Sequence, residues 1–99
     1  MTDLDSYLRL FKWFRVDSKM LYTGRIDAEA TLRLIDNIAA LAHHACEIND
    51  HLPDMFIDPL RKYHAGDAEA VRFFQDPDRR AFFLSDLLDM LVLYKGRYR

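Results

Sequence analysis

Residues 27–52, DAEATLRLIDNIAALAHHACEINDHL, form the longest uninterrupted helical pattern in the chain. At about 100° per residue, the apolar side chains fall in two adjoining bands that together cover roughly 200° of the helix circumference. An ordinary surface helix has an apolar stripe of about half that width, so this helix is predicted to pack against neighbours on two sides. The bands contain Leu32, Leu34, Ile35, Ile38, Ala39, Leu41, Ala42, Ala45, Cys46, Ile48 and Leu52.

Both ends of this helix carry recognisable signals. Asp27 is predicted to cap the first free N–H groups, and Glu29 suits the positive end of the helix macrodipole. Pro53 has no amide proton and disfavours a helical conformation of the residue before it, so the helix is predicted to end near Leu52. We interpret this helix as the spine of the fold.

The length and composition predict one ordered globular domain. A chain of 99 residues is long enough for one ordinary domain and too short for two. Hydrophobic residues make up 51% of the chain and only 3 residues are glycine, which excludes a typical disordered protein. The net charge of −2 gives no general reason to expect binding to nucleic acid or to an anionic membrane.

A cytoplasmic protein is predicted. The single cysteine, Cys46, has no internal disulfide partner and lies in the apolar arc, where a buried thiol is expected. The first ten residues, MTDLDSYLRL, lack the basic region and the apolar run of a signal peptide. No apolar run approaches the roughly 20 residues that span a bilayer.

A second helix is predicted over residues 3–22. Its core-facing stripe follows the helical period and contains Leu4, Tyr7, Leu8, Phe11, Phe14 and Leu21. Trp13, Val16 and Met20 recur at i, i+3 and i+7 and would form a further apolar stripe on the other side. Residues 8–16 also suit a β-strand, but no second strand pattern exists to pair with it, so a helix is favoured.

Three further helices are predicted, at residues 59–65, 68–75 and 77–95. Aspartate–proline pairs at 58–59 and 76–77 predict two of the starts, because aspartate caps a helix and proline suits its first position. Gly66 and Gly96 predict two of the ends. The predicted fold class is therefore all-α, a single-domain helical bundle of three long and two short helices over residues 1–99.

No catalytic residue is predicted. Asp86 and Asp89 lie three residues apart on the last helix and resemble a pair of carboxylates for acid–base chemistry, but no histidine or cysteine is near in sequence. We expect these carboxylates to form ion pairs with Arg79 or Arg80, or with an arginine of a neighbour. The chain is therefore predicted not to be an enzyme.

One polar cluster has the residue types of a metal site. His43, Glu47 and His51 follow at i, i+4 and i+8, so they share a helix face. Imidazoles and carboxylates at this spacing suit a divalent transition metal such as zinc, iron or nickel, with His64 or a second subunit completing the site. The alternative interpretation is a solvated face with weak Glu–His pairs and no cofactor.

The basic C-terminus permits a third interpretation. Lys95, Arg97 and Arg99 alternate with Tyr94 and Tyr98, residue types that pair with phosphates and stack on bases. A few cations without a wider basic face bind nucleic acid poorly, so a charged chain end is the favoured interpretation.

Apolar surface in excess of one small core indicates a partner protein. Besides the wide arc of residues 27–52, two of the predicted helices carry a second apolar stripe, and aromatic residues, methionine and arginine are enriched at interfaces. The alternative is that helices 59–65 and 68–75 cover the stripe on the first helix. We predict a small regulator, adaptor or inhibitor that binds another protein and forms a homodimer, with these contact residues: Trp13, Val16, Met20, Arg9, Phe82 and Leu93.

Overall fold

The computed structural model describes residues 3–25, 27–44 and 53–97 and confirms the all-α fold class. Within these ranges no residue lies in a β-strand. The helices described are α1 (Asp3–Trp13), α2 (Ser18–Thr23), α3 (Ala28–His44), α4 (Asp54–His64), α5 (Ala68–Gln75) and α6 (Pro77–Arg97).

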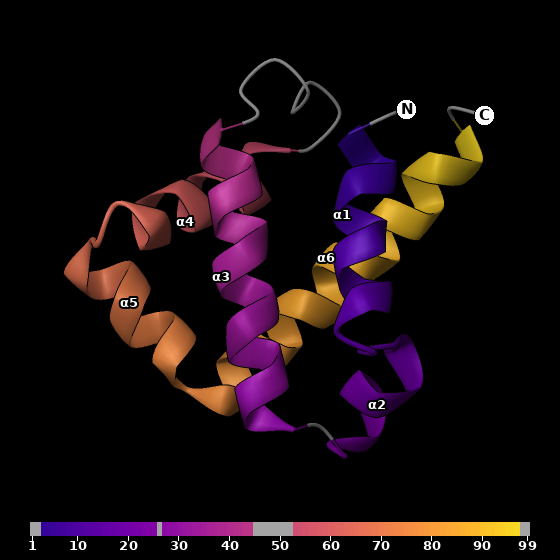
Figure 1. Ribbon diagram of the computed structural model, residues 1–99, viewed down its shortest axis with the longest axis horizontal. Helices are drawn as coiled ribbons and strands as arrows, with labels where there is room; N and C mark the ends of the chain where they lie inside the picture. The colour runs from indigo at the N-terminus through magenta and orange to yellow at the C-terminus, as the bar shows by residue number, and fades with distance from the viewer. Residues whose placement is uncertain (1–2, 26, 45–52, 98–99) are drawn as a thin grey trace.

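Helix α3 lies at the centre of the arrangement and packs against α1, α4, α5 and α6. Figure 1 shows α4 and α5 on one side of α3, α1 and α2 on the other, and α6 crossing behind them. The start of α1 and the end of α6 lie at the same end of the molecule (Figure 1). Among the described helices, none is both long enough and apolar enough to cross a membrane.

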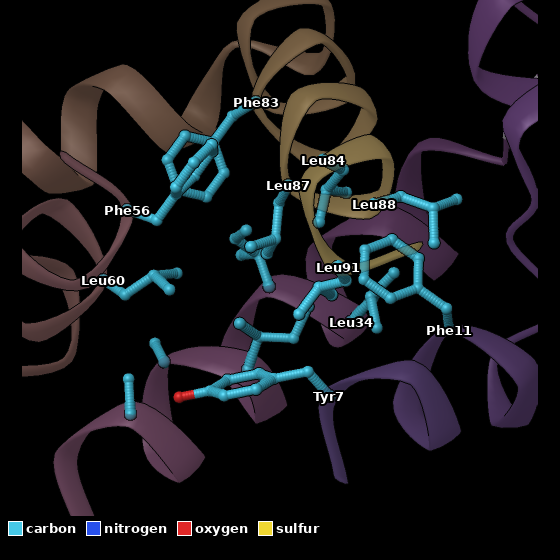
Figure 2. Packing of buried hydrophobic residues seen from close by; sticks show 14 of the residues in the cluster. Tyr7, Phe11, Leu34, Phe56, Leu60, Phe83, Leu84, Leu87, Leu88 and Leu91 are labelled. Carbon is cyan, nitrogen blue, oxygen red and sulfur yellow. The ribbon is translucent and has the colours of Figure 1, made fainter. Parts of the chain in front are cut away.

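The hydrophobic core lies between α1, α3, α4 and the inner face of α6. Figure 2 shows side chains from all four helices converging there. On α6, every third or fourth residue is buried, which is the spacing of one helix face. The labelled core residues are Tyr7, Phe11, Leu34, Phe56, Leu60, Phe83, Leu84, Leu87, Leu88 and Leu91.

The structure confirms the described part of the α3 prediction. Its two apolar bands are largely covered by the neighbouring helices, and the fully buried members are Leu34, Ile35, Ile38, Ala39 and Ala42. The cap is also confirmed, since the backbone N–H of Glu29 donates to Asp27 Oδ1 over 2.9 Å. The remainder of the predicted helix, residues 45–52, lies outside the described residues.

The prediction of one helix over residues 3–22 is wrong, because α1 ends at Trp13. The N–H of Val16 donates to the Phe11 carbonyl (3.0 Å) and that of Arg15 to the Lys12 carbonyl (3.1 Å). This is the Schellman pattern of a helix end, and Arg15 takes the left-handed conformation that it requires, with φ 56°. Asp17 then caps α2 by accepting the N–H of Met20 over 2.9 Å.

The predicted start at Pro59 is also wrong. Helix α4 begins at Asp54, and the Phe56 and Ile57 N–H groups donate to the Pro53 carbonyl over 3.0 and 3.1 Å. The earlier start places Phe56, Ile57 and Leu60 together on the buried face. Pro59 lies inside the helix, where it removes one backbone hydrogen bond, and burial of the apolar face outweighs that loss.

The two C-terminal helices follow the prediction more closely. Helix α5 has the predicted bounds, and Asp67 Oδ1 accepts the Ala70 N–H over 3.1 Å. Helix α6 starts at Pro77 as predicted, with Asp76 accepting the Asp78 N–H over 2.9 Å. Its predicted end at residue 95 is wrong, since Gly96 is helical and α6 runs to Arg97.

Arg80 joins α6 to α5 and α3 from a position that is only 3% exposed. Its guanidinium donates to the carbonyl oxygens of Phe74 and Ala28, each over 2.7 Å, and to Thr31 Oγ1 over 3.0 Å. These partners are neutral, so the buried charge is held by dipoles rather than by a carboxylate. The expected pairing of Arg80 with Asp86 or Asp89 is therefore wrong. Arg79 pairs instead with Asp76, at an N–O distance of 3.8 Å.

Candidate interaction surface

The face of α6 that points away from the core carries the first candidate surface. Successive steps of four, three and four residues place Phe82, Asp86, Asp89 and Leu93 on one line, which we call the outer stripe. Phe82 is 70% exposed and Leu93 is 57% exposed. The outer stripe therefore presents two large apolar side chains separated by two carboxylates.

The two carboxylates of the outer stripe differ in their contacts. Asp89 accepts a hydrogen bond from the hydroxyl of Tyr22 on α2. Asp86 is exposed and has no ion pair among the side chains that the structure describes. The centre of the outer stripe is consequently acidic, and within the described part of the chain the charge of Asp86 is not compensated by an ion pair.

A groove of about 440 Å³ lies beside the outer stripe, between α1, the turn after it and α6. We call it the α1–α6 groove. Lys12, Arg15, Asp17 and Ser18 form its polar edge, and Asp17 is already engaged as the cap of α2. Its apolar lining consists of Leu8, Phe11, Val16, Leu88 and Val92. The groove therefore combines an apolar floor with two exposed cations.

The predicted stripe of Trp13, Val16 and Met20 does not form a single surface. Because α1 ends at Trp13, the three residues do not follow one helical phase. Val16 turns inward and is 4% exposed, Met20 is half-buried, and Trp13 remains 79% exposed. Helices α4 and α5 pack on α3 and α6 and leave Trp13 exposed, so the alternative in which they cover this stripe does not hold at Trp13.

A second groove, of about 620 Å³, lies between α4, α5 and the start of α6. We call it the α4–α5 groove. Its apolar residues include Met55, Phe73 and Phe83, and its edge carries charges of both signs: Asp58, Lys62, Asp67, Glu69, Arg72 and Arg79. This groove was not predicted, because the helix predicted over residues 59–65 left Met55 outside any helix and Asp58 only as its cap.

The predicted metal site is only partly described. His43 on α3 lies against His64 on α4, with ring centroids 4.6 Å apart and planes inclined by 31°. A metal about 2.0–2.1 Å from one nitrogen of each ring needs both lone pairs to converge, and rings this close to parallel would first have to rotate. Glu47 and His51 lie outside the described residues, and no group of three possible ligands occurs within them.

A second tyrosine–carboxylate contact joins α4 to the polar face of α3. The hydroxyl of Tyr63 donates to Asp36. Burial, together with the hydrogen bond and the negative charge of Asp36, raises the pKa of Tyr63 to about 12. Asp36, on the polar face of α3, is thus hydrogen-bonded within the molecule.

The chain matches no protein-family model, no curated protein and no solved structure. The side chains of Lys95, Arg97 and Arg99 are outside the described part, so the predicted nucleic-acid contact stays a prediction. The exposed apolar and charged surfaces of the described helices are therefore the basis for a functional proposal.

Proposed function

We propose that this protein is a small non-enzymatic interaction module, a regulator, adaptor or inhibitor, that acts by binding another protein and forms a homodimer. The observation that carries the proposal is the exposure of Phe82, Val92 and Leu93 on α6. The same helix buries four leucines on its inner face, so apolar residues lie on both of its sides.

The energetic reason is the cost of leaving these side chains in water. Burying one large apolar side chain contributes roughly 1.5–3 kcal/mol. Single exposed apolar residues are ordinary in soluble proteins, but three on one helix, with Trp13 exposed on its neighbour α1, form a candidate contact region. Aromatic and aliphatic anchors of this kind carry most of the binding energy in protein interfaces.

Sedimentation velocity and native mass spectrometry over a range of concentrations test the proposal. We expect a dimer that is converted to monomer by Phe82→Ser with Leu93→Ser, while helicity is unchanged. Met55→Ser is the matched control, since Met55 is equally exposed and lies in the α4–α5 groove, and this variant should dimerise as the parent does. Trp13→Ser tests whether the end of α1 contributes.

A monomeric parent protein across the micromolar range would contradict the homodimer. A dimer that dissociates on Met55→Ser but survives Phe82→Ser with Leu93→Ser would contradict the choice of surface.

The closeness of the His43 and His64 rings, 4.6 Å between centroids, supports a second candidate function, the binding of a divalent transition metal once the rings rotate, with Glu47 and His51 as the further ligands that the sequence predicts. Calorimetric titration with zinc or nickel tests it. A bound metal ion should be lost in His43→Ala and weakened in His64→Ala. The absence of binding by the parent protein would remove this candidate.

A further inference from the structure

We propose that the outer stripe of α6 docks on the α1–α6 groove of a second copy of this chain, and that the reciprocal contact forms at the same time. The inference rests on the proposed homodimer and names its contact surfaces. In each contact the Asp86 and Asp89 carboxylates of one copy face Lys12 and Arg15 of the other.

Charge complementarity identifies the second copy as the occupant. The outer stripe has two carboxylates, and Asp86 has no ion pair among the described side chains. The edge of the groove has two exposed cations, Lys12 and Arg15, and its one carboxylate is engaged as a helix cap. The outer stripe is therefore net negative and the edge of the groove net positive, and opposite potentials across an interface favour the correct partner.

The apolar parts of the two surfaces also match. The groove is floored by leucine, phenylalanine and valine side chains, and its volume of about 440 Å³ gives room for an aromatic ring. Phe82 and Leu93 are the side chains of the outer stripe that would enter it. Burial of such apolar anchors inside a ring of charged contacts is the usual anatomy of a protein interface.

The positions of the two surfaces allow a closed dimer. Val92 belongs to the groove and its neighbour Leu93 to the outer stripe, so the surfaces adjoin on the C-terminal half of α6. Figure 1 shows α1 crossing in front of this half of α6, and the two helices pack against each other. If a two-fold axis relates the two copies, the outer stripe of each copy binds the α1–α6 groove of the other. This arrangement gives a closed dimer rather than an open chain.

The simplest competing arrangement is unfavourable. If two outer stripes met each other in antiparallel orientation, Asp86 of one copy would oppose Asp89 of the other, because Phe82 and Leu93 flank the pair symmetrically. Four carboxylates would then lie together in the interface, and like charges in contact cost several kcal/mol. Docking on the basic groove avoids this repulsion.

A charge-exchange experiment tests the proposal. One chain carries Lys12→Glu with Arg15→Glu, and the other carries Asp86→Lys with Asp89→Lys. Each chain alone should dimerise about 100-fold more weakly than the parent, because both of its contacts become repulsive. An equimolar mixture should form a heterodimer with a Kd within about tenfold of the parent value, since opposite charges then face each other in both contacts.

Two controls keep the outcome specific. Lys62→Glu with Arg72→Glu makes the same charge change in the α4–α5 groove and should leave dimerisation unchanged. Asp86→Lys alone preserves the bond between Tyr22 and Asp89 and should weaken self-association while circular dichroism shows unchanged helicity.

The results separate this inference from the function on which it rests. If either charge-exchanged chain dimerises as tightly as the parent, if the mixture fails to restore the dimer, or if the control substitutions weaken it equally, the docking assignment is wrong and the homodimer stands. If the parent protein itself is monomeric, both the homodimer and this inference are overturned.

Discussion

Helices α3 and α6 both carry apolar residues around much of their circumference, but the molecule uses them differently. The apolar bands of α3 are packed by neighbours on two sides except at Leu32, which is 37% exposed. The rest of its exposed face is mainly polar, with Arg33 paired to Glu29 at 2.6 Å and Asp36 bonded to Tyr63. Helix α6 buries one face in the same core and leaves Phe82, Val92 and Leu93 in water. A wide apolar arc is therefore no sign of an interface by itself, and what matters is whether the fold covers it.

The largest effect on stability is expected for substitutions on the buried faces of α3 and α6, where the two helices should behave alike. Ile38→Ala on α3 and Leu87→Ala on α6 each remove a fully buried side chain and should each lower the free energy of unfolding by about 3 kcal/mol. Urea denaturation followed by circular dichroism measures this. A loss below about 1 kcal/mol at Leu87 would mean that α6 is not part of the core.

Arg80→Met tests the junction that ties α6 to α3. The substitution keeps the volume but leaves the Phe74 and Ala28 carbonyl oxygens without their guanidinium donor, so the unfolding free energy should fall by about 3 kcal/mol. Arg79→Met, one residue earlier at an exposed position, is the control and should change it by less than about 0.5 kcal/mol.

Arg15→Gly should stabilise the protein by about 1 kcal/mol, because glycine adopts the left-handed conformation without the steric cost that a side chain incurs. Arg15 has φ 56° in the turn that ends α1. The change in thermal midpoint measures the effect, with Arg9→Gly, inside α1, as a control that should destabilise. Destabilisation by Arg15→Gly would contradict the Schellman ending of α1.

Tyr63→Phe tests the hydrogen bond that engages the polar face of α3. Since the folded pKa of Tyr63 is raised to about 12, its stabilising contribution is complete below the unfolded pKa of about 10 and is lost as the pH rises from 10 through 12. The variant should be about 1 kcal/mol less stable at neutral pH. Its unfolding free energy should also fall less steeply across that alkaline range, as measured by urea titrations at each pH.

The smallest effect on stability is expected on the outer stripe. Phe82→Ser or Leu93→Ser should change the unfolding free energy of the monomer by less than about 0.5 kcal/mol, because neither side chain is buried by the fold. Measurements at protein concentrations below the dimer Kd report the unfolding free energy of the monomer alone. A loss comparable to that at Leu87 would show that the outer stripe is covered within one chain.

Local signals predicted much of the fold. The aspartates at residues 27 and 76 and the wide apolar arc of residues 27–52 were sufficient to predict the starts of α3 and α6 and the central position of α3. Where a local signal conflicted with the burial of apolar side chains, burial determined the structure. The Asp58–Pro59 pair predicted a helix start, but burying Phe56 and Ile57 places the start at Asp54.

The candidate surface was predicted only in part. Phe82 and Leu93 follow from the phase of one unbroken helix, and both are exposed as expected. Val16 was misplaced because a left-handed arginine ends α1, a conformation that its sequence does not favour, although Asp17 and Ser18 signal a new start. The grooves and the approach of His43 to His64 depend on packing between helices that are distant in sequence.

The neutral surroundings of Arg80 have a consequence for acid tolerance. Carbonyl and hydroxyl oxygens accept its hydrogen bonds, and none of these groups takes up a proton in mildly acidic solution. The helix caps, by contrast, depend on the aspartates at positions 17, 27, 67 and 76. The junction of α3, α5 and α6 is therefore held without any carboxyl group, and its hydrogen bonds should persist when the solution is acidified.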